Sequence, residues 1–218
     1  MMKKILFCVA ITLLWHILPL HAQNSGWVSL FNGKTLDGWK QMGGQAKYAV
    51  EKGAIAGTTV PATPNSFLVT EKEYGDFVLE LEVKLPDSAT NSGIQLRSHF
   101  NPDANDGKGR VYGYQYELDG SARAWTAGIY DEGRRGWLYP LDLNPAAKKA
   151  FRQGQYNKVR VECIGNTIKT WINNVPAAYL VDEADASGFI ALQVHGIGNS
   201  RNREKQYTGE ISVSKPRE

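Results

Sequence analysis

In several stretches of this sequence, apolar side chains recur at every second position, and that period restricts the chain to β-structure. Successive side chains of a strand point to opposite faces, so such alternation predicts strands with one buried and one solvated face. No segment after residue 23 shows a long helical period. The clearest strand covers residues 77–85, with apolar positions at Phe77, Leu79, Leu81, Val83 and Leu85.

Turn residues separate the expected strands at short intervals. Gly165-Asn166 predicts a tight hairpin between strands at 159–163 and 168–172, and Asn173-Asn174 predicts a second turn. The one helical signal is Asn144-Pro145, which suits the start of a short helix reaching Phe151. Many short strands with turns between them predict an all-β fold, a two-sheet jelly-roll β-sandwich with one short helix. Further strands are expected at residues 189–194 and 211–213.

The first 22 residues have the pattern of a secretory signal peptide. Lys3 and Lys4 precede an apolar run, and Ala22 offers a small residue for cleavage. A membrane anchor is the alternative, but the run is short for a bilayer span and no basic cluster follows it. We therefore expect a periplasmic or extracellular protein whose residues 23–218 form a single domain, with no membrane insertion after cleavage.

Loss of the leader changes the cysteine content and the charge. Cys8 leaves with it, so Cys163 has no partner for an internal disulfide. The formal charge of +3 falls to +1 without Lys3 and Lys4, too little to attract nucleic acid, so no nucleic-acid partner is expected.

Three expected strands carry polar residues of an unusual kind on one face. A solvated face usually mixes long Lys and Glu side chains, whereas this set contains amides, carboxylates, imidazoles and one arginine but no lysine. If these strands share a sheet, the residues would line a polar cleft; the alternative is that some belong to buried networks. Strand parity places them together as Gln95, Arg97 and His99, then Gln115, Glu117 and Asp119, then Gln193 and His195.

From Trp27 to about Ser214, the chain resembles the bacterial 3-keto-disaccharide hydrolase domain family. The resemblance implies a concanavalin A-like jelly roll and a secreted glycoside hydrolase acting on 3-keto-glycosides or related disaccharides. The segments that carry it are Leu30 to Trp39, Tyr74 to Phe77, Asn91 to Arg97, Tyr116 to Asp119, Thr126 to Tyr130, Trp171 to Asn173 and Gly188 to Gly196.

The implied chemistry is elimination followed by hydration, a net hydrolysis. A ketone at carbon 3 acidifies the hydrogen at carbon 2, a base removes it, and the group at carbon 1 leaves before water adds. This needs a base, an acid and a stabiliser for the enolate oxygen. The proton-transfer roles could be filled by His195, Glu117 and Asp119, with His195 slightly favoured over Glu117 as the base. Arg97 could stabilise the oxyanion. The expected substrate-binding residues are Gln95, His99, Gln115, Tyr130, Trp137 and Gln193, with Trp137 in a loop.

Other functions stay open from the sequence. An ordinary glycosidase needs two opposed carboxylates, and Glu117 would require a partner such as Asp131. No cofactor is expected, although His195, Glu117 and Asp119 offer ligand types that a divalent metal accepts. The alternative to an enzyme is a non-catalytic carbohydrate-binding module of the periplasm or cell envelope, because the jelly roll serves both functions.

Overall fold

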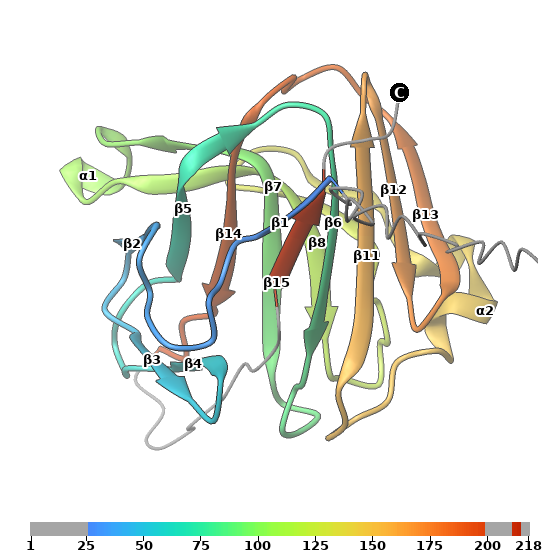
Figure 1. Cartoon of the computed structure of the whole chain (residues 1–218), viewed down its shortest axis with the longest axis horizontal. Helices are drawn as coiled ribbons and strands as arrows, with labels where there is room; N and C mark the ends of the chain where they lie inside the picture. Colours follow the sequence, from blue (N-terminus) through green and yellow to red (C-terminus); the bar gives the residue numbers. More distant parts are fainter. Residues whose placement is uncertain (1–25, 199–210, 215–218) are drawn as a thin grey trace, which may run out of the picture.

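The computed structural model describes residues 26–198 and the strand at 211–214, and the expected signal peptide lies outside these residues. Two antiparallel sheets pack face to face (Figure 1). The six-stranded sheet runs in the order β1 (Trp27–Ser29), β15 (Ile211–Ser214), β6 (Phe77–Val83), β11 (Asn157–Ile164), β12 (Thr167–Ile172) and β13 (Val175–Val181).

The second sheet has seven strands, and a separate hairpin accompanies it. The seven-stranded sheet runs in the order β10 (Gly136–Tyr139), β9 (Ile129–Glu132), β8 (Arg110–Asp119), β7 (Asn91–Asn101), β14 (Gly188–Val194), β5 (Ser66–Tyr74) and β2 (Trp39–Gly43). The hairpin is formed by β3 (Lys47–Glu51) and β4 (Ala54–Thr58). The predicted fold class, an all-β two-sheet sandwich, is confirmed.

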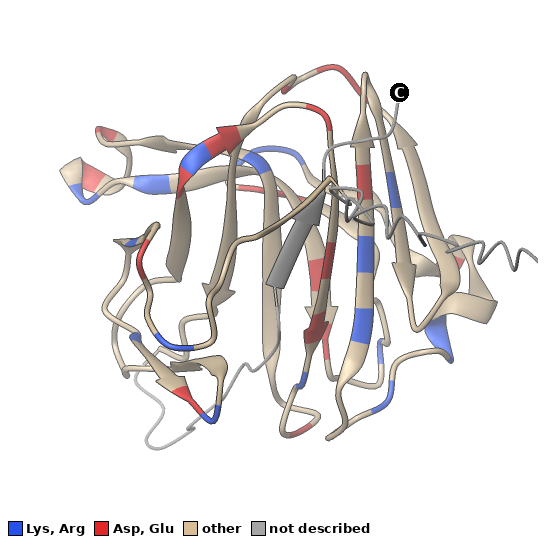
Figure 2. Cartoon of the chain, in the orientation of Figure 1, with Lys and Arg blue, Asp and Glu red and all other residues tan. Residues whose placement is uncertain are grey.

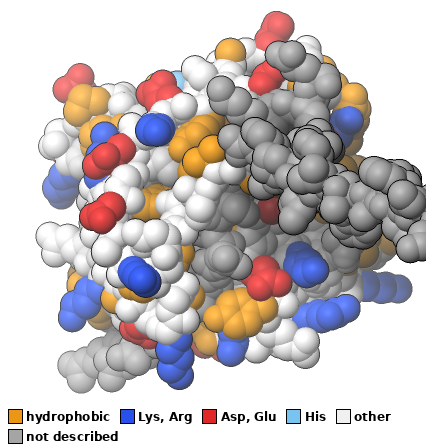
Figure 3. Space-filling model, in the orientation of Figure 1, with side chains coloured by type: hydrophobic (Ala, Val, Ile, Leu, Met, Phe, Trp, Pro, Cys, Tyr) orange, Lys and Arg blue, Asp and Glu red, His pale blue; other side chains and the backbone are white. Residues whose placement is uncertain are grey.

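The two-residue period forms the sheets as expected. In β6 and β11, Leu79 lies opposite Val161 on the buried face, and both are fully buried. The next pair along the same strands, Glu80 and Arg160, forms an ion pair on the outer face. Charged residues of both signs therefore mark the solvent side of these strands (Figure 2), and they are interspersed over that face of the molecule (Figure 3).

Helices are minor elements of the described chain. The predicted helix is present as α2 (Pro145–Lys148), where the Asn144 side chain accepts a hydrogen bond from the backbone N–H of Ala147. It is shorter than expected and follows a 3-10 turn at Leu141–Leu143. A further turn, α1 (Ala104–Gly107), was not predicted. No helix among residues 26–198 is long and apolar enough to cross a bilayer.

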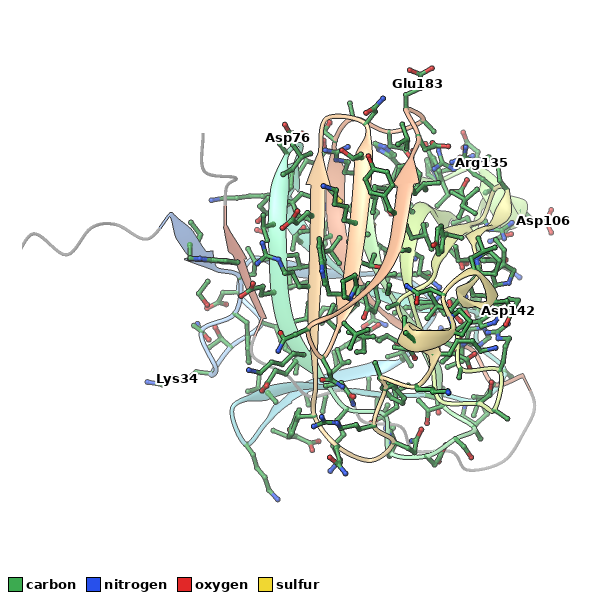
Figure 4. The ribbon with its side chains drawn as sticks, turned by 90° about the vertical axis from the view of Figure 1, so that its right-hand side faces the viewer. Lys34, Asp76, Asp106, Arg135, Asp142 and Glu183 are labelled. Atoms are coloured by element: carbon green, nitrogen blue, oxygen red, sulfur yellow. The ribbon has the colours of Figure 1, made fainter. Side chains whose placement is uncertain are left out.

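Beyond residue 96, β7 and β8 continue as a long hairpin arm with α1 at its tip (Figure 1). Phe100 and Val111 of this arm pack with Phe67, Val69 and Phe189 in a second apolar cluster, separate from the main core. Asp106, near the tip, lies on the side of the molecule that also carries Arg135, away from β1 and β15 (Figure 4). The arm therefore covers part of the outer face of the seven-stranded sheet.

The arm begins at a β-bulge, where the pairing of β7 with β8 shifts between Leu96 and His99. Arg97 adopts a left-handed backbone conformation there, with φ of 46°. A one-residue irregularity exchanges the faces of all side chains that follow it. Ser98 therefore contacts Gln95, which strict alternation placed on the opposite face. The prediction that Arg97 and His99 share a cleft with Gln95 is wrong for this reason.

Arg97 instead closes one end of the sandwich, and its side chain is almost fully buried. Its Nε donates to the Gly75 carbonyl at 2.8 Å, and Nη1 donates to the Gly165 carbonyl at 2.7 Å. Nη2 forms an ion pair with Asp76 at 2.9 Å, at the end of the molecule where Figure 4 labels that carboxylate. Because Gly165 belongs to the β11–β12 turn, this one side chain ties the two sheets together.

Replacing Arg97 with alanine should destabilise the protein strongly. The change removes a nearly fully buried guanidinium group together with its bonds to Gly75, Gly165 and Asp76, and the loss of such a group costs about 3 kcal/mol. Urea unfolding of Arg97→Ala should show this loss, whereas Arg152→Ala, at an exposed position, should stay within about 0.5 kcal/mol of the parent. Equal stabilities for the two variants would contradict this role for Arg97.

Candidate functional site

A polar pocket of about 320 Å³ lies on the outer face of the seven-stranded sheet, beside the arm. Strands β7, β8, β9, β10 and β14 contribute most of its lining. The lining residues are Asn65, Asn91, Gln115, Glu117, Arg123, Tyr130, Glu132, Trp137, Gln193 and His195. The sequence-based grouping of Gln115 and Glu117 with Gln193 and His195 is therefore confirmed.

Glu117 is the buried carboxyl group of this pocket, with a side chain about 4% exposed. Its Oε1 accepts hydrogen bonds from Asn91 at 2.7 Å and Arg123 at 3.2 Å, and its Oε2 accepts from Gln115 at 3.0 Å. Burial raises the pKa of Glu117 to about 7, because desolvation outweighs these donors, which favour the charged form. A carboxyl group with this pKa can both accept and donate a proton near neutral pH.

Buried amide side chains hold Glu117 in place through a chain of hydrogen bonds. Gln95 and Gln193 both donate to the side-chain oxygen of Gln115, whose amide group in turn donates to Glu117. Gly93 allows this arrangement, because a Cβ there would lie 2.2 Å from the Gln115 side chain. Gln193 Oε1 is buried and has no hydrogen-bond partner among the described residues, so it is available to a ligand hydroxyl.

Arg123, in the loop that follows β8, closes one side of the pocket and is bound by Asp119, the last residue of β8. Asp119 has the predicted parity but is not among the pocket-lining residues. It accepts hydrogen bonds from Arg123 Nε at 2.8 Å and from the Ser121 backbone. Burial alone would raise the pKa of Asp119, but the bonds from Ser121 and Arg123 lower it overall. Asp119 is thus suited to holding Arg123 rather than to transferring protons.

Aromatic rings form one wall of the pocket. The Trp137 ring meets Tyr130 edge-on, with 5.1 Å between centroids, and meets Trp125 at 4.5 Å. The Arg123 guanidinium lies 4.9 Å from the Trp137 centroid. Trp137 belongs to β10 and is paired with Tyr130, so the predicted loop position is wrong. The strand fixes both rings toward the pocket, where they can pack against an apolar sugar face.

Glu132 is a second carboxyl group in the pocket, and the sequence analysis missed it. Burial raises the pKa of Glu132 above its ordinary value, while Arg110, Asn65 and His195 act in the opposite direction. Strand parity could have found this residue, because Glu132 lies two positions after Tyr130 in β9. Asn65 and Asn91 were also missed as lining residues, and Asn65 comes from the segment before β5, where no pattern pointed to a site.

Several predicted residues lie outside the pocket. Gln95 is buried behind Gln115, and Arg97 ties the two sheets. His99 lies 3.2 Å from Asp185 and packs on Tyr112, at another part of the sheet. Asp131 is fully buried and paired with arginines, so it cannot oppose Glu117.

His195 lines the rim of the pocket, exposed to solvent, with Nδ1 2.8 Å from the Gly196 carbonyl. The metal ligand set considered from the sequence combined His195 with Glu117 and Asp119. Within residues 26–198, no three His, Cys, Asp or Glu side chains are grouped closely enough to hold a metal ion. These three residues therefore do not form a ligand set.

The sequence matches one family model over most of its length. Residues 26–207 match the family described as the 3-keto-alpha-glucoside-1,2-lyase-like domain. No curated protein matches the sequence.

Solved structures share the fold at low sequence identity. A protein from Parabacteroides distasonis named "putative glycosyl hydrolase" superposes with a TM-score of 0.60 at 20% identity, over 88% of this chain and 94% of that one. The carbohydrate-binding module CBM66 from Bacillus subtilis gives 0.54 at 14% identity, over 81% and 95%. A Bacillus subtilis protein with a galectin-like fold gives 0.57 at 9% identity, over 81% and 89%. Together, the family and these relatives indicate a carbohydrate-related function.

The raised pKa of Glu117 makes a prediction about stability. Its value in the folded protein, about 7, exceeds the ordinary 4.5, so the folded state holds this proton more tightly than the unfolded chain. Stability from this group is therefore full below pH 4.5 and is lost as pH rises to 7, by up to about 3 kcal/mol. Glu117→Gln keeps a neutral side chain and should avoid that loss.

Urea unfolding at pH 5 and pH 8 checks this. The stability of Glu117→Gln relative to the parent should rise between the two pH values, whereas Glu71→Gln, at an exposed position of β5, should show no such change. A pH-independent difference between Glu117→Gln and the parent would show that Glu117 is not a desolvated carboxyl group.

Proposed function

Because the chain belongs to the 3-keto-alpha-glucoside-1,2-lyase-like domain family, we propose that it cleaves glycosides that carry a ketone at carbon 3 of the sugar. The reaction is elimination across carbons 1 and 2 followed by addition of water. The observation that carries this proposal is Glu117, a buried carboxyl group facing a polar pocket with a pKa of about 7. A base with that pKa suits removal of the carbon 2 hydrogen, which the neighbouring ketone acidifies.

Glu117 replaces His195 as the favoured base. His195 lies exposed at the rim, whereas Glu117 is desolvated and held by three donors. Removal of water strengthens the electrostatic interactions of a carboxylate, and fixed donors hold it in one orientation. His195 is placed to exchange protons between the pocket and solvent.

Arg123 is the group best placed to stabilise the enolate oxygen. An arginine has five N–H donors, and the bonds of Arg123 to Glu117 and Asp119 leave others free to face the pocket it lines. A cation held beside the reacting atoms stabilises negative charge as it develops on the enolate oxygen. Gln193 Oε1 can accept a hydrogen bond from a sugar hydroxyl, and Trp137 can pack against the ring.

A carbohydrate-binding module is the second candidate, favoured by the aromatic wall and by the structural likeness to CBM66. Binding alone requires aromatic rings and amides, but it gains nothing from a carboxyl group with a raised pKa. Desolvating Glu117 costs stability, as the pKa shift implies, and such a cost is typical of catalytic sites. The buried acid therefore favours an enzyme.

We also propose that the protein acts outside the cytoplasm, after removal of residues 1–22, on the basis of the N-terminal sequence pattern. The mass of the exported protein measures this directly, and a chain retaining the leader would contradict it.

Turnover separates the two candidates. Purified protein should release the leaving group from a 3-keto-glycoside and leave the corresponding plain glycoside intact. Glu117→Gln should lower turnover by roughly a hundredfold or more, the usual contribution of a proton-transfer group. Glu71→Gln is the matched control and should retain full turnover.

Three outcomes decide the matter. Cleavage of both sugars would indicate an ordinary glycosidase, and binding without cleavage of either would indicate a binding module. Full activity of a folded Glu117→Gln variant would remove Glu117 from the mechanism.

A further inference from the structure

A second pocket, of about 300 Å³, adjoins the first one beneath the β7–β8 arm. The two pockets share Asn65 and Glu132 in their linings. Ligand sites usually span roughly 300–1,000 Å³, so each pocket alone is small and the two together are well within that range. The second pocket is lined by Gly43, Pro64, Asn65, Phe67, Asn105, Gly109, Arg110, Val111 and Glu132.

This lining combines groups that sugars use. Phe67 and Val111 supply an apolar surface, while Arg110 supplies a guanidinium group at an exposed position. The charge of Arg110 lowers the pKa of Glu132. Among the described residues, no hydrogen bond or ion pair involves the Arg110 guanidinium. Its N–H donors are therefore available to a ligand. The Asn65 side-chain amide donates a long hydrogen bond, of 3.4 Å, to Glu132 Oε1, and its oxygen accepts one from the Gly196 backbone at 2.9 Å.

Glu132 marks the boundary between the two pockets. In the register of β8 and β9 it lies opposite Gly113, four residues from Glu117 along β8. Four residues of strand cover roughly 13 Å, so the backbones of Glu117 and Glu132 are well separated along the sheet, while both residues line the first pocket. A glycosidic bond joining rings in the two pockets would pass beside Glu132.

We propose that the pocket beneath the arm binds the leaving group of the substrate, a hydroxyl-rich ring, and that Glu132 donates a proton to the glycosidic oxygen between the two pockets. This inference rests on the proposed function and extends it to a second subsite and a second catalytic residue. Desolvation of Glu132 supports the role, because burial favours the protonated form that an acid catalyst needs.

The elimination balances with these two residues. The carboxylate of Glu117 takes the hydrogen from carbon 2 as a proton, and its electron pair becomes the carbon 1–carbon 2 double bond. The bond between carbon 1 and the glycosidic oxygen breaks with its electron pair on oxygen, and that oxygen takes the proton of Glu132. The free leaving sugar departs from the arm pocket. Water then adds its hydroxyl group to carbon 1 and gives its other proton to the carboxylate of Glu132, while carbon 2 takes back the proton held by Glu117, so both residues return to their starting states.

Binding of plain sugars tests the subsite without any turnover. Calorimetry on the intact protein would compare maltose, sucrose and trehalose with methyl α-glucoside, which has no second ring. At least one disaccharide should bind about tenfold more tightly than the methyl glucoside, and Arg110→Ala should remove that gain while leaving the methyl glucoside unchanged. Arg152→Ala is the matched control and should bind like the parent.

If no disaccharide binds more tightly, or if Arg110→Ala weakens both kinds of sugar equally, the subsite is refuted. This result is independent of the keto chemistry, so a real subsite would survive a failure of the proposed reaction.

Leaving-group dependence tests Glu132. Nitrophenolate leaves without protonation, so Glu132→Gln should reduce cleavage of a 3-keto-disaccharide by roughly a hundredfold and cleavage of a p-nitrophenyl 3-keto-glucoside far less. Equal losses on both substrates would refute the acid role. If the parent cleaves neither substrate, the proposed function and the acid role fall together, and calorimetry alone decides the subsite.

Discussion

The left-handed bend at Arg97 is the feature on which the arrangement of the outer face depends. A non-glycine residue in this conformation is strained by about 1–2 kcal/mol, yet the hydrogen bonds of its buried guanidinium to both sheets offset that cost. Gly188 of β14 admits the bend, because a Cβ there would lie 2.4 Å from the Arg97 carbonyl carbon. The same irregularity redirects β7, so that the arm covers the sheet and encloses the second pocket.

The pocket is built by a different principle, a buried acid supported by neutral amides. Gln95 and Gln193 fix the side chain of Gln115 by hydrogen bonds, and Gln115 in turn fixes Glu117, all without adding a charge. Had lysine or a second arginine stood in their place, the carboxylate would be stabilised and its pKa would fall. Amides fix the geometry, and their hydrogen bonds lower the pKa of Glu117 less than desolvation raises it. The stability lost by burying Glu117 is thus coupled to its suitability as a base.

The sequence predicted the regular parts of the fold well, because they follow from local periodicity. β6, β11, β12 and β14 appear where alternation placed them, and the faces of Gln115 and Glu117 followed from parity alone. Parity predicted the wrong faces for Arg97 and His99, because the bulge depends on the pairing of β7 with β8 and β14, which the alternation within β7 does not reveal. Glu132 was within reach of the same reasoning, since it lies two positions after Tyr130 and therefore on the same face of β9.

The same sandwich is shared by a carbohydrate-binding module and by a protein named "putative glycosyl hydrolase", so the fold cannot separate binding from catalysis. What separates them is where charge is buried. Arg160 and Glu80 pair on the outer face of the other sheet, where solvent screens them and little depends on the pair. Glu117 is instead buried, and Glu132 half-buried, on a face whose neighbouring cations, Arg123 and Arg110, are exposed. A surface that only recognised sugars would gain nothing from raising the pKa of two carboxyl groups by burial. The arrangement is explained if one group must take a proton and the other must give one up.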